Sequence, residues 1–176
     1  MSAKSYPWYL IGGIFAFLVI RYFYFQNPLV FGATAPLFCK ERTDGRIICL
    51  DSAVDHYVLL DFWGSWCGPC RSANQIYALM YDRYQNASFK EAKGIRFISV
   101  ALEKNRNNAL LAIRQDGLHW PDQIIQEEML DSELAKLYNI KRLPASFLIG
   151  PGGRIILSDP DIKELDDYLA HNLLKN

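Results

Sequence analysis

Two cysteines stand close together in the stretch FWGSWCGPCRS (62–72), as Cys67 and Cys70. Cysteines at this spacing form a redox couple, supply half of a zinc site or make a small structural crosslink. A zinc site needs further ligands, and the remaining cysteines, Cys39 and Cys49, have the wrong mutual spacing for a second pair. A disulfide that closes so small a loop stabilises a fold little. The pair therefore predicts redox chemistry, and we expect no metal.

The segments around the pair predict its position. HYVLLDFW (56–63) is apolar almost throughout and rich in β-formers, which indicates a central strand, and SANQIYALMYDRY (72–84) has the apolar spacing of an amphipathic helix. Cys67 then lies at a helix N-terminus, where unpaired N–H groups and the helix dipole stabilise a thiolate. We expect Cys67, with a lowered pKa, to be the exposed nucleophile. Cys70, one turn deeper, would resolve the mixed disulfide.

Residues between and beside the cysteines suit this role. Gly68 leaves the approach to Cys67 uncrowded, and Pro69 falls in the first helical turn, where its missing N–H costs nothing. Trp66 immediately precedes the nucleophile and is expected to shape the surface on which a substrate docks. Trp63 is expected to pack beneath the site.

The rest of the folded part alternates strands and helices. Apolar runs predict strands over 94–102 and on both sides of a Gly152-Gly153 turn, and helical patterns cover 107–117, 131–140 and 161–174. Asp131 and Gly117 are the expected N-cap and end of two of these helices. This order predicts an α/β fold with a central mixed sheet and helices on both faces.

An Asp44-Gly45 turn signal between two short strand-like runs predicts a hairpin that carries Cys39 and Cys49. With a three-residue loop the two cysteines lie opposite each other and can form a disulfide. With a two-residue loop the two cysteines are out of register by one residue, and their side chains point to opposite faces of the hairpin. The sequence does not fix the loop length, and of the two interpretations we favour buried free thiols.

Residues 6–25, YPWYLIGGIFAFLVIRYFYF, are apolar and aromatic apart from Arg21. About 20 such residues cross a hydrocarbon core of roughly 30 Å, so we predict an uncleaved membrane anchor over 1–26, a linker over 27–36 and a folded domain over 37–176. A cleaved signal peptide and an interfacial helix are the alternatives. Charge bias alone does not give the orientation.

Composition narrows the function further. The 176 residues carry 19 basic and 19 acidic side chains, with no basic run among aromatics, which excludes nucleic-acid binding. The three histidines lie far apart and match no common metal motif. No cofactor is expected.

DFWGSWCGPC resembles the active-site signature of the thioredoxin superfamily. GATAPLF, DGRIICLDS, LHWPDQI and LAKLYNIKRLPASFLIGPGGRII are similar to blocks of its TlpA/ResA-like branch of membrane-anchored thiol-disulfide oxidoreductases. Together these blocks cover most of residues 32–158. The resemblance implies a thioredoxin-like fold with a cis-proline at Pro144 that faces the cysteines. The backbone of Leu143 would then pair with an extended substrate chain.

The resemblance also assigns Asp61 to the buried acid beneath the cysteine pair. Burial should raise its pKa and let it relay a proton to or from Cys70. The lysine that partners this acid in thioredoxins aligns near Ser99, so that pairing is absent. Glu103 is a further acid in this region, although a carboxylate at a strand end is usually solvated.

We therefore expect an extracytoplasmic, membrane-tethered reductase of disulfides in partner proteins, with apocytochrome c as one substrate that suits the branch. Its Gly-Pro dipeptide matches thioredoxin, whose potential is about −270 mV, and an upstream thiol reductant must regenerate the dithiol. The alternative is a non-catalytic thioredoxin-like binding or chaperone module. A peroxiredoxin is excluded, because GSWC lacks the Thr and Pro that precede the reactive cysteine there.

Overall fold

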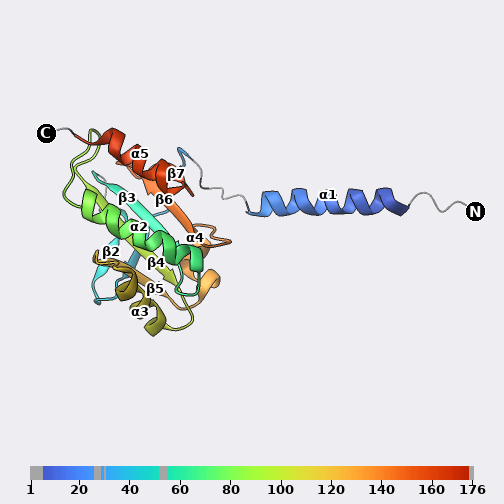
Figure 1. Ribbon diagram of the computed structural model, residues 1–176, viewed down its shortest axis with the longest axis horizontal. Helices are drawn as coiled ribbons and strands as arrows, with labels where there is room; N and C mark the ends of the chain where they lie inside the picture. The colour runs from blue at the N-terminus through green and yellow to red at the C-terminus, as the bar shows by residue number, and fades with distance from the viewer. Residues whose placement is uncertain (1–5, 26–28, 30, 52–54, 175–176) are drawn as a thin grey trace, which may run out of the picture.

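The computed structural model describes residues 6–25, 29, 31–51 and 55–174 (Figure 1). Its centre is a five-stranded sheet in the order β5-β4-β3-β6-β7. The strands are β3 (Tyr57–Trp63), β4 (Ile95–Leu102), β5 (Asp122–Gln126), β6 (Ala145–Ile149) and β7 (Ile155–Ser158). β3, β4 and β5 are parallel, whereas β6 and β7 run antiparallel, so the predicted mixed sheet is confirmed. β5 was not predicted from the sequence, because three of its five residues are polar.

Helices cover both faces of the sheet, as predicted (Figure 1). The crossovers β3-α2-β4 and β4-α3-β5 place α2 (Gly68–Tyr84) and α3 (Arg106–Asp116) on one face, where α5 (Ile162–Asn172) also packs. The 3-10 helix η2 (Met129–Asp131) and α4 (Glu133–Leu137) follow β5, and α4 packs on the other face. α3 ends at Gly117 in the left-handed conformation, as expected. α4 starts one residue later than expected, because the Ser132 side chain, not Asp131, accepts the N–H of Ala135.

Every residue of β3 is buried, because layers cover both sides of this strand. Its side chains alternate between the faces. Leu60 and Phe62 belong to the apolar cluster shared with α4, while Leu59 and Trp63 belong to the cluster under α2, α3 and α5. Asp61 is two residues from both Leu59 and Trp63, so its side chain points to the same face of the sheet as theirs, the face that carries α2.

The predicted hairpin is present, with strands β1 (Cys39–Glu41) and β2 (Ile47–Cys49). Arg42 donates its N–H to the carbonyl of Arg46, which closes a three-residue loop, and Gly45 takes φ +83° there. This loop sets Cys39 opposite Cys49, and the two form a disulfide. The expectation of free thiols is therefore wrong.

Residues 32–35, which fall in the predicted linker, run alongside the start of β7. Gly32 and Ala35 donate N–H groups to the carbonyls of Ile155 and Gly153 at 2.8 Å each. Ala35 is buried in the core. This end of the predicted linker is thus part of the folded domain, while residues 26–28 and 30 lie outside the described residues.

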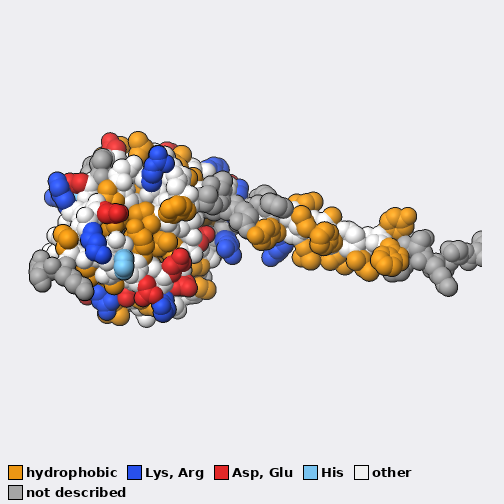
Figure 2. All heavy atoms as spheres, turned by 90° about the horizontal axis from the view of Figure 1, so that it is seen from above, with side chains coloured by type: hydrophobic (Ala, Val, Ile, Leu, Met, Phe, Trp, Pro, Cys, Tyr) orange, Lys and Arg blue, Asp and Glu red, His pale blue; other side chains and the backbone are white. Residues whose placement is uncertain are grey.

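Helix α1 (Tyr6–Phe25) forms over the predicted apolar segment. Figure 2 shows apolar side chains along its length, and those of Trp8, Ile11 and Phe15 are among the exposed ones. Within the described part of the chain, no helix meets the length and hydropathy required for a membrane span. The structure thus confirms the helix and does not confirm the span.

Candidate functional site

The Cys67–Cys70 pair lies where β3 ends and α2 begins. The two cysteines form a disulfide with a Cα–Cα distance of 5.2 Å. Cys67 occupies the N-cap position of α2, and its Sγ accepts the backbone N–H of Cys70 at 3.3 Å. Pro69 falls in the first turn of the helix. The helix start therefore points N–H groups at Cys67, the arrangement that stabilises a thiolate after reduction.

Both cysteines are buried in this oxidised form. Cys67 is 7% exposed and Cys70 1%, and both pack in the apolar cluster that contains Trp63. The expectation of an exposed Cys67 is wrong here, because the disulfide turns its sulfur toward Cys70 and the core. Gly68, by contrast, is exposed, and a Cβ placed on it would meet nothing within 4 Å. Substrate access is thus open beside the pair.

Trp66 is fixed beside the disulfide and half exposed. Its Nε1 donates to the carbonyl oxygen of Leu102 at 2.9 Å, and 52% of the residue surface remains accessible. The indole lies so close to Gly64 that a Cβ there would come within 2.6 Å of Nε1. Trp63 is fully buried, as expected. The site therefore presents one ordered aromatic surface to solvent.

Asp61 lies on β3, on the face that carries α2. It is 3% exposed, and burial raises its pKa to about 8. Its register partners are Ser99 on β4 and Ser146 on β6. Among the described residues Asp61 Oδ2 has no hydrogen-bond partner. The expected buried acid with a raised pKa is present.

Sequence reasoning missed Tyr77 as part of this buried polar cluster. Tyr77 follows Cys70 by two helical turns on the buried face of α2, and its hydroxyl donates to Ser146 Oγ at 3.4 Å. Burial raises the pKa of Tyr77, and the charge of Asp61 raises it further. The spacing from Cys70 was the available signal, since residues seven apart share a helix face.

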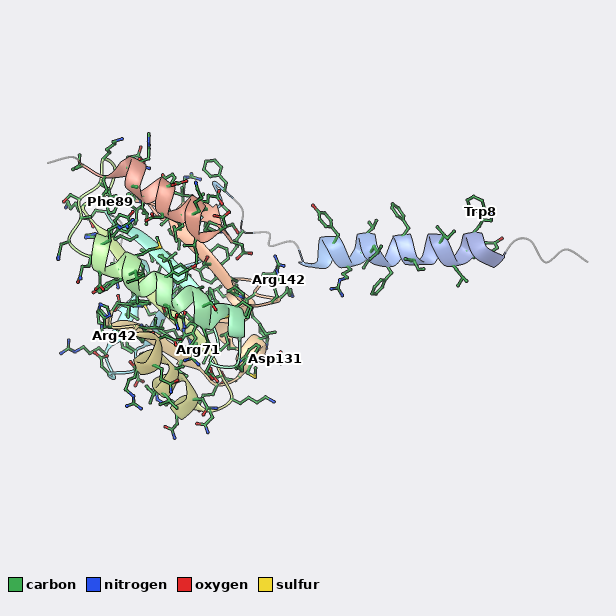
Figure 3. The ribbon with its side chains drawn as sticks, viewed as in Figure 1. Trp8, Arg42, Arg71, Phe89, Asp131 and Arg142 are labelled. Atoms are coloured by element: carbon green, nitrogen blue, oxygen red, sulfur yellow. A yellow bond between two sulfur atoms is a disulfide. The ribbon has the colours of Figure 1, made fainter. Side chains whose placement is uncertain are left out.

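Two acidic residues hold the segments on either side of the cysteines. Glu103, just after β4, is 2% exposed, and its Oε1 accepts the N–H of Ser65. Asp116, at the end of α3, pairs with Arg71 at 2.6 Å and with Asn74 Nδ2 at 3.0 Å. Figure 3 shows Arg71 near the start of α2, beside α3. Glu103 is therefore buried, contrary to the solvated carboxylate that its position suggests, and the Arg71–Asp116 pair was not anticipated.

Pro144 precedes β6, and the Leu143–Pro144 peptide bond is cis, as the resemblance implies. Pro144 is exposed, and Leu143 packs against both apolar clusters.

The described residues hold one group of three possible metal ligands, Cys39, Cys49 and Asp51, and its two cysteines are already joined.

Comparison with known proteins agrees with this geometry. The profile of a family described as thioredoxin-like matches residues 55–155. The chain is 28% identical over 163 residues to the thiol-disulfide oxidoreductase ResA of Bacillus thuringiensis subsp. konkukian, covering 91% of this chain and 88% of that one. It is 26% identical to ResA of Bacillus subtilis, where the match covers 71% of this chain and 64% of the relative.

Solved structures agree as well. A thiol-disulfide oxidoreductase from Bacteroides fragilis superposes with a TM-score of 0.69 at 30% identity, over 79% of this chain and 98% of that chain. The thioredoxin domain of an oxidoreductase from Bacteroides vulgatus shares the fold with a TM-score of 0.70 at 23% identity. The chain belongs to the thioredoxin-like family and, by homology, is a thiol-disulfide oxidoreductase of the ResA/TlpA kind.

Proposed function

We propose that the protein reduces disulfides of extracytoplasmic partner proteins through Cys67 and Cys70. The observation that carries this proposal is the position of Cys67 at the N-cap of α2, where its sulfur accepts the N–H of Cys70 at 3.3 Å. A negative sulfur at a helix N-terminus is stabilised by the dipole and by unpaired N–H groups. A thiolate at this position is a nucleophile near neutral pH.

Two exchange steps complete the reduction. The Cys67 thiolate attacks one sulfur of the substrate disulfide, a mixed disulfide forms, and the other substrate sulfur leaves as a thiolate and takes up a proton. Cys70 then loses its proton and attacks Cys67. The second substrate thiolate leaves, and the Cys67–Cys70 disulfide remains. Two electrons pass to the substrate, and a thiol reductant must return two to the pair.

Asp61 is proposed to take the proton from Cys70 in the second step. It lies on β3, on the face of the sheet that carries α2, with a pKa of about 8, raised by burial. Near pH 7 only about a tenth of such a group is ionised and able to act as a base. Resolution of the mixed disulfide should therefore speed up as the pH rises toward 8.

Substrate docking is assigned to the exposed groups around the pair. The half-exposed Trp66 supplies an apolar platform, and the exposed Gly68 and Pro69 leave the helix start beside the buried Cys67 open to a substrate. Leu143 and Pro144 lie before β6, where the backbone of Leu143 would pair with an extended substrate strand.

The second disulfide supports the location. Stable disulfides persist in oxidising compartments and are rare in a reducing cytosol. The Cys39–Cys49 bond, away from the redox pair, therefore favours an extracytoplasmic space. There we propose disulfide-bearing proteins, apocytochrome c among them, as substrates. Attachment of the domain to the membrane is assigned to α1, whose apolar side chains are exposed.

Reduction of insulin by the full chain in detergent, with dithiothreitol as electron donor, tests the redox function. We expect the wild type to accelerate insulin precipitation and Cys67→Ser to give the uncatalysed rate. Equal acceleration by both proteins, or none by the wild type, would instead indicate a binding module. For the location, we expect the full chain to sediment with membranes and a chain lacking residues 1–28 to be released. Sedimentation of both would exclude α1 as the attachment.

A further inference from the structure

Asp61 is closed off from solvent, so a proton that it takes up must leave through the protein. The residue is 3% exposed, and within the described part of the chain its Oδ2 has no hydrogen-bond partner. Near pH 7 the carboxyl is mostly protonated, so it must release a proton before it can accept that of Cys70. Proton transfer needs a polar group within hydrogen-bond reach, directly or through one water.

Two buried hydroxyl groups lie on the same face of the sheet as this carboxyl. Ser146 on β6 is the register partner of Asp61 on β3, and directly opposed residues have Cβ atoms about 5 Å apart, with side chains on the same face. Tyr77 reaches this face from α2, and its hydroxyl donates to Ser146 Oγ at 3.4 Å. A serine hydroxyl that accepts one hydrogen bond keeps its own proton to donate. Ser146 therefore lies within reach of the unpartnered carboxylate oxygen.

A second acid, Asp159, adjoins the same serine and is exposed. Its Oδ1 accepts the N–H of Ser146 at 3.0 Å, and its own N–H donates to the Ser146 carbonyl at 2.7 Å. The charges of Asp61 and Asp159 both raise the pKa of Tyr77, so its hydroxyl lies in the field of both carboxyl groups. The two hydroxyls thus lie between a buried acid and an acid at the surface.

We propose that the hydroxyls of Ser146 and Tyr77 are the path by which Asp61 exchanges its proton with solvent beside Asp159. The inference deepens the proposed function, because it rests on Asp61 as the acceptor of the Cys70 proton. Ser146 and Tyr77 act through Asp61 and not on a sulfur, so both are positioning residues.

The protons balance along this path. Asp61 gives its proton to the Ser146 oxygen, while Ser146 gives its own hydroxyl proton to the Tyr77 oxygen. The phenolic proton then passes to water beside Asp159, whose charge attracts it. Each hydroxyl ends with one proton, and only Asp61 gains a negative charge. A hydroxyl donates, accepts and rotates between the two, which alanine and phenylalanine side chains cannot do.

Tyr77→Phe removes one hydroxyl and keeps the buried ring. The full chain in detergent, with Cys39→Ser/Cys49→Ser so that Cys67 and Cys70 are the only cysteines, is reduced and mixed with dithiobis(nitrobenzoate). Attack by Cys67 releases one coloured thiolate, and attack by Cys70 releases the second. For Tyr77→Phe near pH 7 we expect an unchanged first phase and a second phase at least about tenfold slower.

Ser146→Ala interrupts the same path at its other hydroxyl, and Ser146→Thr keeps one. We expect the alanine variant to slow the second phase as much as Tyr77→Phe does, and the threonine variant to stay within about twofold of wild type. The double variant Tyr77→Phe/Ser146→Ala should be no slower than either single variant, because residues that act as a unit are not additive. Effects that multiply in the double variant would mean two separate roles and would overturn the shared path.

Tyr84→Phe is the matched control. Tyr84 lies seven residues beyond Tyr77 on the same buried face of α2, but its hydroxyl donates to Asp166 Oδ1 at 2.6 Å. We expect both phases of this variant to match the wild type. Equal slowing in the two phenylalanine variants, slowing of both phases in Tyr77→Phe, or no slowing at all would overturn the proposal.

A merely structural role for Tyr77 would persist at higher pH, whereas the proposed role would not. At about pH 9 most Asp61 has lost its proton before the turnover begins, so we expect the second phase of Tyr77→Phe to return to within about twofold of wild type. Of the other titratable groups around the path, Cys70 also ionises more as the pH rises. Tyr77 stays protonated because burial raises its pKa, and Arg142 attracts the charge of Asp159. A defect of the same size at both pH values would overturn the inference.

These measurements separate the inference from the proposed function. Dithiobis(nitrobenzoate) is not a protein, so a selectively slowed second phase would uphold the path even if insulin were not reduced. Insulin reduction with an unchanged second phase in Tyr77→Phe and Ser146→Ala would leave the function standing and exclude the path. Redox equilibration with glutathione should change less than about twofold in either variant, because a proton path alters a rate and not an equilibrium. Circular dichroism confirms that each variant is folded before it is compared.

Discussion

The molecule contains two disulfides whose surroundings differ in almost every respect. Cys67–Cys70 joins residues three apart at the start of a helix, directly after the half-exposed Trp66. Cys39–Cys49 joins residues ten apart across a two-stranded hairpin. In the hairpin Cys39 is exposed and Cys49 is partly buried. The surroundings of Cys67–Cys70 therefore suit a redox-active disulfide, and those of Cys39–Cys49 suit a structural one.

The hairpin also keeps its shape by contacts that do not involve sulfur. The hydrogen bond from Leu50 N–H to the Phe38 carbonyl makes Cys39 and Cys49 a non-hydrogen-bonded pair, in which side chains approach closely. Arg42 bonds to Asp122 at 2.9 Å and thereby ties the hairpin to β5. The Cys39–Cys49 bond reinforces a hairpin that is already ordered, whereas Cys67–Cys70 lies at a helix start that stabilises a thiolate.

The largest expected difference between the two disulfides is in activity after one cysteine of each is replaced by serine. We expect Cys67→Ser to lose insulin reduction by at least about a thousandfold, since removal of a covalent nucleophile costs on that order. Cys39→Ser should keep activity within about twofold. Initial rates of insulin precipitation with dithiothreitol measure both. A comparable loss in both variants would mean that the hairpin disulfide takes part in exchange.

The buried Asp61, on the sheet face covered by the helix of the redox pair, should leave a pH-dependent cost in stability. An unfolded aspartate loses its proton near pH 4, but Asp61 keeps it to about pH 8. Between these values ionisation stabilises only the unfolded chain, so this contribution lowers the free energy of unfolding from about pH 4 to about pH 8 and then stays constant. We expect Asp61→Asn to gain about 2–5 kcal/mol relative to wild type across that interval.

Urea unfolding of the oxidised proteins at several pH values measures that gain. Asp131→Asn, which replaces an aspartate whose side chain is 90% exposed, is the control for the same change at the surface. A constant difference for Asp61→Asn would mean that Asp61 ionises with an ordinary pKa in the folded protein.

Removal of the hairpin disulfide should affect stability without affecting chemistry. Cys39→Ser/Cys49→Ser opens a loop of about ten residues, for which chain entropy predicts a loss of about 2–3 kcal/mol. We expect insulin reduction to stay within about twofold, because the hairpin packs on the face of the sheet that carries α4, whereas the redox pair lies at the start of α2 on the other face. Urea unfolding and initial rates give the two quantities. Loss of activity in a variant that remains folded would connect the two regions.

Local patterns predicted the elements around the redox pair, and long-range packing decided the rest. The apolar run of β3 and the periodicity of α2 placed Cys67 at a helix start without any tertiary information. The Cys39–Cys49 bond depended on a loop length that Gly45 sets through its positive φ. Burial of Glu103 depended on where the Gly64–Trp66 loop returns against β4, which no local pattern encodes.

The glycines beside the two disulfides should give the smallest effects, with a clear difference between them. A Cβ on Gly45 or on Gly68 would meet nothing within 4 Å, so crowding does not distinguish the two. Gly45 has φ +83°, where an L-residue costs about 1–2 kcal/mol, whereas Gly68 is helical, where alanine is favoured over glycine. We expect Gly45→Ala to lose about 1 kcal/mol and Gly68→Ala to lose nothing.

Gly45→Asn is the matched variant for this comparison, because asparagine tolerates the left-handed conformation better than alanine. Its loss of stability should be smaller than that of Gly45→Ala, and urea unfolding measures all three variants. Equal stability of the alanine and asparagine variants would mean that the three-residue loop does not depend on the backbone conformation at this position. The register that opposes Cys39 to Cys49 would then be maintained by the disulfide and by the Arg42–Asp122 contact.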